Sequence, residues 1–97
     1  MARPKKIRII RGEPQIRQFS PRGRIGRPGY IELKMEEYEA LSRADYMGDS
    51  QAEAAREMHI SQQTFSRVLN NGRKRLAEAL IRGLTIKIHG GAYRVGK

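Results

Sequence analysis

The spacing of apolar side chains is most informative over residues 51–68, where two helical patterns follow each other closely. Apolar or small residues recur there at the i, i+3/i+4 spacing of one helix face, first at Ala54, Ala55 and Met58 and then at Phe65 and Val68. The segment His59–Ser61 between them fits a tight turn, in which His59 stands where many such turns have a glycine with positive φ. The Ser61 hydroxyl can cap the following helix. This pattern predicts a helix-turn-helix, whose second helix enters the major groove of DNA. An ordinary helical hairpin without a nucleic-acid role has the same spacing.

The flanking pattern predicts a first helix over about residues 34–47, ended by Gly48, with an apolar stripe that includes Met35, Tyr38 and Leu41. Ser50 and Glu53 have the capping-box spacing that starts the second helix. The last helix is predicted from about Gln62 to Ile81. Gly72 in its middle is expected to mark a close contact, because glycine inside a helix costs about 1 kcal/mol relative to alanine. The predicted core stripe of this helix consists of Phe65, Val68, Leu69, Leu76 and Leu80.

Outside the helices the sequence predicts short strands. Residues 1–30 hold all four prolines and read as a basic, mostly irregular N-terminal arm with one possible strand near residues 6–9. Tyr30–Leu33 is a strand or the lead-in to the first helix. Residues 84–95 predict a β-hairpin turning at Gly90-Gly91, with Ile88 opposite Tyr93. The predicted fold is therefore mainly α, a three-helix helix-turn-helix domain over residues 31–97 with a short C-terminal hairpin.

Charge is distributed unevenly along the chain, which has a net charge of +10. Residues 1–30 carry nine Lys or Arg side chains against Glu13, and residues 61–97 carry eight against Glu78. Residues 31–60 are acidic. Positive charge on the N-terminal segment and on the predicted second helix of the motif indicates a polyanionic partner.

Composition argues against several other classes of protein. The chain has no cysteine for a disulfide or a zinc thiolate site, and its two histidines lie far apart in the sequence. We find no apolar run long enough for a membrane span and no signal peptide, and we expect a cytoplasmic, nucleoid-associated protein. The acidic residues of the first helix, Glu36, Glu37 and Glu39, read as a solvated face. No catalytic residue, metal site or cofactor is predicted, so we do not expect an enzyme.

The candidate DNA contacts fall into three groups. Gln can bond adenine and Arg can bond guanine through paired hydrogen bonds, so the predicted base-reading residues are Gln62, Gln63, Ser66 and Arg67. The predicted phosphate contacts are Ser61, Thr64, Asn71, Arg73, Lys74 and Arg75. In the Arg22–Gly29 stretch, Arg24 and Arg27 are weaker candidates for a minor-groove contact, because Ile25 interrupts the AT-hook order that the stretch resembles; a flexible linker that touches only phosphates fits as well.

From Leu33 to Tyr93 the chain resembles the DUF134/UPF0251 family of small prokaryotic proteins, whose helix-turn-helix is similar to the promoter-reading domain of sigma factors. The resemblance rests on Glu37–Leu41 with Asp45, on Gln51 with Ala54-Ala55, on Met58–Arg67, on Arg73–Leu80 and on Gly90–Tyr93. Phe19–Gly23 also resembles the family's F-x-P-x-G. Many members have cysteines near the N-terminus, which this chain lacks, so no metal or redox role is carried over. The resemblance implies a DNA-binding protein.

These observations predict sequence-specific binding of double-stranded DNA by a transcriptional regulator. A homodimer is a further hypothesis, since domains of this kind often read paired half-sites. Two alternatives remain open at this point. One is a protein-interaction module that contacts RNA polymerase through the acidic first helix. The other is an RNA-binding protein, which the basic N-terminus supports but which lacks clustered aromatics for stacking unpaired bases.

Overall fold

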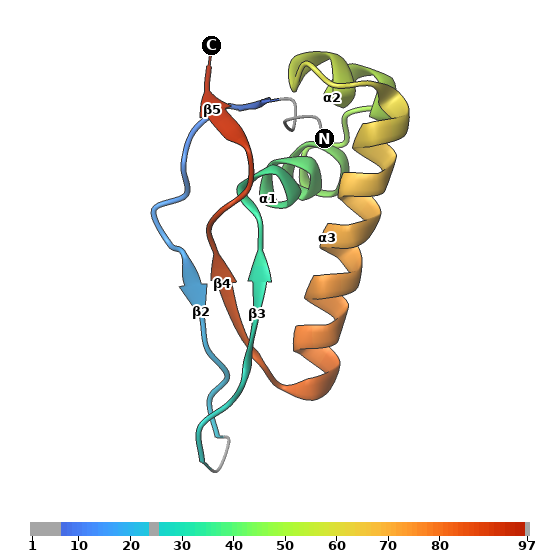
Figure 1. The fold of residues 1–97 in the computed structure, drawn as a ribbon. Coiled ribbons are helices and arrows are strands. Elements are labelled where there is room, and N and C mark those ends of the chain that lie inside the picture. The colour runs from blue at the N-terminus through green and yellow to red at the C-terminus, as the bar shows by residue number, and fades with distance from the viewer. Residues whose placement is uncertain (1–6, 24–25, 97) are drawn as a thin grey trace, which may run out of the picture.

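The computed structural model describes residues 7–23 and 26–96 and shows a mixed α/β fold. Figure 1 shows the long helix α3 on one side of the molecule and the strands on the other, with α1 between them at one end. The three predicted helices are present, and a short π-helix, η1, extends the first. In chain order the elements are β1 (Arg8–Ile10), β2 (Gln18–Phe19), β3 (Tyr30–Leu33), α1 (Met35–Leu41), η1 (Ser42–Tyr46), α2 (Gln51–Glu57), α3 (Gln62–Arg82), β4 (Thr85–Ile88) and β5 (Tyr93–Val95).

The predicted C-terminal hairpin is wrong, because β4 and β5 lie in different sheets. Strand β4 is the centre of a three-stranded sheet, paired with β2 antiparallel and with β3 parallel. Both edges of β4 are thus occupied, and its backbone groups have no edge left to offer β5. Gly90 and Gly91 do take positive φ, 82° and 90°. The chain there crosses the start of α1, where the Gly90 carbonyl accepts a hydrogen bond from the Met35 amide (3.1 Å).

The described part of the N-terminal stretch is built into the fold by two strands. The short strand predicted near residues 6–9 is observed as β1, which pairs in parallel with β5, and β2 pairs with β4. Ile9 and Ile10 are buried, and the Ile9 amide donates to the carbonyl of Met58 at the end of α2 (3.1 Å). Strands from both ends of the chain therefore complete the same layer.

Two clusters of buried apolar side chains hold the layers together. Where α1, α2 and α3 meet, the cluster consists of Ala40, Ala54, Ala55, Met58, Ile60, Phe65, Val68 and Leu69. Between the strands and the helices it consists of Ile10, Ile31, Leu33, Met35, Ala79 and Ile88. Fully burying one large apolar side chain stabilises the fold by about 1.5–3 kcal/mol, so these clusters are the main source of stability.

On α3 the predicted core residues Phe65, Val68 and Leu69 are buried, whereas Leu76 is only half-buried and belongs to neither cluster. Gly72 is buried where α3 crosses α1, and a β-carbon there would lie 3.2 Å from the Glu37 Cβ. The predicted close contact is thereby confirmed. Leu80, predicted to be core, is 77% exposed, because the sheet covers the last turns of α3 only on the side of Ala79.

The acidic residues of α1 are buried, so the prediction of a solvated face is wrong. Glu36, Glu37 and Glu39 are only 3%, 5% and 1% exposed. The Glu39 carboxylate accepts hydrogen bonds from the Nε atoms of Arg11 (2.9 Å) and Arg43 (2.8 Å). Buried carboxylates require such partners.

The other two carboxylates are also satisfied. Glu36 faces Arg8 at 3.6 Å and accepts the Ala92 amide at 3.3 Å. Glu37 accepts the Lys34 amide at 2.9 Å and so caps α1. Part of the positive charge of the N-terminal segment is therefore used inside the fold.

Within residues 7–23 and 26–96, none of the helices combines the length and the apolar character needed to cross a membrane. In the same ranges, no group of three or more His, Asp or Glu side chains is arranged to hold a metal ion.

The shared carboxylate of Glu39 gives a direct test of the buried ion pairs. Glu39→Gln is expected to lower the free energy of unfolding by about 3 kcal/mol, the lower end of the cost of breaking a buried ion pair, because Arg11 can turn toward water. Urea unfolding measures this change. Glu57→Gln removes the same charge from an exposed site of α2 and should change stability little. Equal effects of the two substitutions would contradict a structural role for Glu39.

Candidate nucleic-acid interface

The turn between α2 and α3 fixes the direction in which α3 leaves the core. His59 takes a φ of 60°, as predicted for this turn, and the Ile60 amide donates to the Ala55 carbonyl (3.0 Å). The Ser61 hydroxyl accepts the Thr64 amide at 3.0 Å and donates to the Thr64 hydroxyl at 2.9 Å. Ser61 and Thr64, predicted as phosphate contacts, thus form the N-terminal cap of α3 in this structure.

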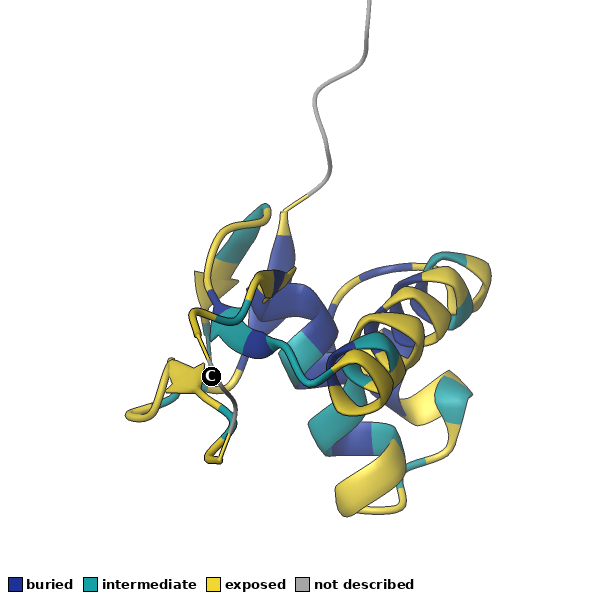
Figure 2. Ribbon diagram, turned by 90° about the horizontal axis from the view of Figure 1, so that it is seen from below, coloured by how far each residue is buried: buried dark blue, intermediate teal, exposed yellow. Residues whose placement is uncertain are grey.

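The four predicted base-reading residues lie on the first two turns of α3, close to the turn. Gln62, Gln63 and Arg67 are exposed and Ser66 is half-buried. Figure 2 shows that the outer side of α3 is exposed while its inner side is buried against the rest of the fold. The exposed side continues along the helix through Asn70 and Lys74. We call the line of Gln63, Arg67, Asn70 and Lys74 the outer ridge of α3.

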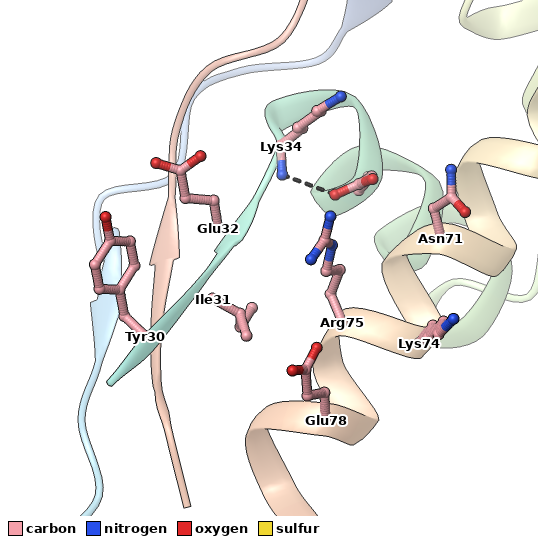
Figure 3. Close-up of a pocket in the computed structure, with 9 residues that line it drawn as sticks. Tyr30, Ile31, Glu32, Lys34, Asn71, Lys74, Arg75 and Glu78 are labelled. Atoms are coloured by element: carbon pink, nitrogen blue, oxygen red, sulfur yellow. Dashed lines mark hydrogen bonds between the residues drawn. The ribbon is translucent and has the colours of Figure 1, made fainter. Parts of the chain in front are cut away.

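Three predicted phosphate contacts, Asn71, Lys74 and Arg75, line a polar hollow of about 670 Å³ beside the outer ridge. Figure 3 shows Arg75 extending from α3 toward the start of α1, with Lys34 above it and Glu78 below. Glu32, Glu37 and Glu78 also line the hollow, so its charges are mixed. Lys34 is a basic residue at this edge that the sequence did not identify, since it is far from α3 along the chain.

Arg73 differs from the other predicted phosphate contacts because it has an acidic partner. Its Nε and an amino group donate to the two carboxylate oxygens of Asp45, at 3.0 and 2.7 Å. These hydrogen bonds hold the pKa of Asp45 below its ordinary value, against a smaller effect of desolvation, and raise the pKa of Arg73. An approaching phosphate would have to compete with Asp45 for this guanidinium.

The predicted minor-groove residues are not close to the base-reading residues. Arg24 lies outside the described residues. Arg27 is exposed in the loop between β2 and β3, where it lines a hollow with Tyr30 and Lys87. Figure 1 shows this loop beyond the C-terminal end of α3, whereas the base-reading residues lie at its N-terminal end. Most of α3, which is about 30 Å long for 21 residues, separates the two groups.

One local signal could have revealed the buried charges. Glu39 and Arg43 are four residues apart in the predicted first helix, a spacing at which opposite charges pair. The partners from distant segments, Arg11 for Glu39 and Asp45 for Arg73, have no such signal.

Comparison with known families shows to which family the chain belongs. The chain belongs to the family described as protein of unknown function DUF134, whose model matches residues 1–96. The resemblance seen in the sequence is thereby confirmed.

The relatives include UPF0251 proteins from several bacteria. The protein of Syntrophobacter fumaroxidans is 44% identical over 92 residues, which cover 94% of this chain and 59% of that protein. The protein of Halothermothrix orenii is 42% identical over 98 residues, covering 100% of this chain and 73% of that protein. The chain therefore spans only part of the length of these relatives. No solved structure matches it.

The left-handed backbone at His59 can be tested by substitution. His59→Val is expected to lower the free energy of unfolding by about 1–2 kcal/mol, because a β-branched residue is strained at positive φ. His59→Gly should leave stability unchanged or raise it, since glycine adopts this φ without strain. Chemical denaturation of both variants measures the difference. Equal losses in both variants would indicate that the imidazole, and not the backbone, matters at this position.

Proposed function

We propose that this chain binds double-stranded DNA in a sequence-specific manner, with α2 and α3 acting as a helix-turn-helix, and that it regulates transcription. The outer ridge of α3 is the observation that carries the proposal. Gln63, Arg67, Asn70 and Lys74 are exposed along it, and residues 61–77 contain no acidic side chain. Such a ridge offers donors to base edges and positive charge to phosphates.

The start of α3 has the chemistry required for reading bases. Glutamine can bond the N6 and N7 atoms of adenine, and arginine the O6 and N7 atoms of guanine, each through two hydrogen bonds. Gln63 and Arg67 are one turn apart on the same side of the helix, so both can enter one groove. Phe65 and Leu69 on the inner side of α3 are packed in the buried cluster. This packing would hold Gln63 and Arg67 in a fixed orientation, which sequence discrimination requires.

The burial of acidic side chains also supports a polyanionic partner. The middle of the chain is acidic, yet Glu36, Glu37 and Glu39 are buried and Asp45 is paired with Arg73. Much of the negative charge therefore faces inward or is neutralised locally. Exposed Arg67 and Lys74 can then attract phosphates, an attraction that weakens with added salt as counterions compete.

The same burial weakens one alternative. A contact with RNA polymerase through the acidic first helix would need Glu36 and Glu37 at the surface, where neither lies. Binding to RNA is a competing hypothesis that the DNA-binding experiment can decide.

The proposal is tested by selecting bound duplexes from a random library and measuring binding of the best site and of an unrelated duplex. Gln63→Ala and Arg67→Ala should each weaken binding to the selected site by about 1–3 kcal/mol and relax the preference at particular base pairs. Lys74→Ala should weaken binding to both duplexes alike and reduce the slope of log K against log salt by about 1.

The controls distinguish the loss of a specific contact from a general loss of charge, and binding of DNA from binding of RNA. Arg17→Ala removes one positive charge from a residue that is already paired with Glu13 and lies directly before β2, and it should change binding little. Single-stranded and duplex RNA of the same sequence are added as competitors. Stronger competition by RNA, or equal losses in Arg67→Ala and Arg17→Ala, would overturn the proposal.

The ion pair of Asp45 and Arg73 gives a second prediction about DNA binding. Asp45→Asn should release Arg73 toward the phosphate backbone, raise the affinity for all duplexes and steepen the salt slope by up to about 0.9. Fluorescence anisotropy titrations at several salt concentrations measure both quantities. In the Asp45→Asn background, Arg73→Ala should cancel the gain. Glu13→Gln serves as a control for net charge, and an equal gain in that variant would show that Arg73 is not involved.

A further inference from the structure

An apolar groove lies on the side of α3 opposite the polar hollow, between the helices and the three-stranded sheet. It has a volume of about 490 Å³, and its lining includes Phe19, Tyr38, Tyr46, Leu76 and Ile86. Phe19 and Ile86 are opposite each other in the β2–β4 pair, so both side chains lie on the same face of the sheet. The groove is therefore the part of this apolar sheet face that α3 does not cover.

Large apolar side chains also stand exposed around the groove. Phe19 is 54% exposed, Tyr46 88% and Leu80 77%. Leu80 follows Leu76 by four residues on α3 and so continues the groove along the same helix face. Apolar surface that continues beyond a cavity is typical of a site that binds another protein surface.

The π-helix η1 shapes the rim of the groove. The Met47 amide bonds to the carbonyl of Ser42 (2.8 Å), five residues back, which adds a residue to this turn. Asp45 of η1 faces Arg73, and Tyr46 projects into solvent next to the groove. Single π-helical turns are frequent at functional sites.

We propose that this apolar groove is the interface through which two copies of the chain form a two-fold dimer. Two chains of net charge +10 repel each other wherever their basic surfaces meet. A second copy can therefore approach more easily at this groove than at the basic faces. Among the described lining residues of the groove the charged side chain is Asp45, and Arg73 neutralises it. The same patch also supplies both parts of an isologous contact, a groove and the projecting Tyr46 and Leu80.

The orientation of the groove fits a dimer that leaves the outer ridge free. Leu76 and Leu80 lie on a flank of α3, more than a third of a turn around the helix from the ridge of Gln63, Arg67 and Lys74. A contact between two such flanks therefore leaves both ridges uncovered. This consequence for DNA rests on the proposed function, which assigns the ridge to base edges. The dimer itself depends only on the groove.

Sedimentation of the purified chain without DNA, over low to high micromolar concentration, tests the interface. The unmodified chain should dimerise. Phe19→Glu places a charge in the groove and Leu80→Glu places one at its edge, so each should shift the chain to monomer. Ile81→Glu and Val95→Glu are matched controls, because both residues are exposed apolar side chains outside the groove, 85% and 50% exposed. These controls should remain dimeric. Circular dichroism and urea unfolding confirm that each variant is folded.

Each outcome decides the proposal. A chain that stays monomeric at every concentration overturns it and points to a different protein as the partner of the groove. Dissociation by Ile81→Glu or Val95→Glu to the same degree as by Leu80→Glu places the interface elsewhere and also overturns it. Because no DNA is present, failure of the dimer leaves the DNA-binding proposal standing. Failure of DNA binding likewise leaves the dimer standing.

Discussion

The carboxylate of Glu39 is the interaction on which the arrangement of the molecule most depends. It lies almost fully buried on α1 and is shared by Arg43, one helical turn on, and by Arg11 from the N-terminal segment. Arg43 in turn reaches Asp49, just before α2. Because a buried charge is costly without partners, this one group fixes the positions of the first strand, the first helix and the entry to α2 relative to one another. The direction of α3 then follows from α2 through the turn at His59.

The local features of the helices could be predicted from the sequence because they depend on neighbouring residues. The capping box of Ser50 and Glu53, the Ser61 cap, the positive φ of His59 and the close contact at Gly72 are all observed. The candidate contacts Gln63, Arg67 and Lys74 also lie on one exposed side, as the helical period implies. Their role in binding DNA stays a prediction.

The parts that the sequence did not reveal depend on segments far apart in the chain. Gly90-Gly91 has the composition of a hairpin turn, but β2 and β3 occupy both edges of β4, and β5 pairs with β1 instead. The glutamates of α1 have the pattern of a solvated face, but arginines from the N-terminal segment pair with Glu36 and Glu39, and α3 packs against Glu37 at Gly72. Leu80 has the period of a core residue, but the sheet ends before covering it. In each case the placement of distant segments overrode a local pattern.

The parallel pairing of β1 with β5 has a consequence for how the chain folds as it is made. Arg8 lies opposite Tyr93, so the first strand finds its partner only after residues 93–95 have been made. Synthesis delivers the N-terminal residues first, and Ile9 and Ile10 must wait with their apolar side chains uncovered. Pairing across so long a loop also slows folding relative to a helical bundle of the same size. The interval before β5 arrives is therefore the time at which the nascent chain is most exposed to aggregation.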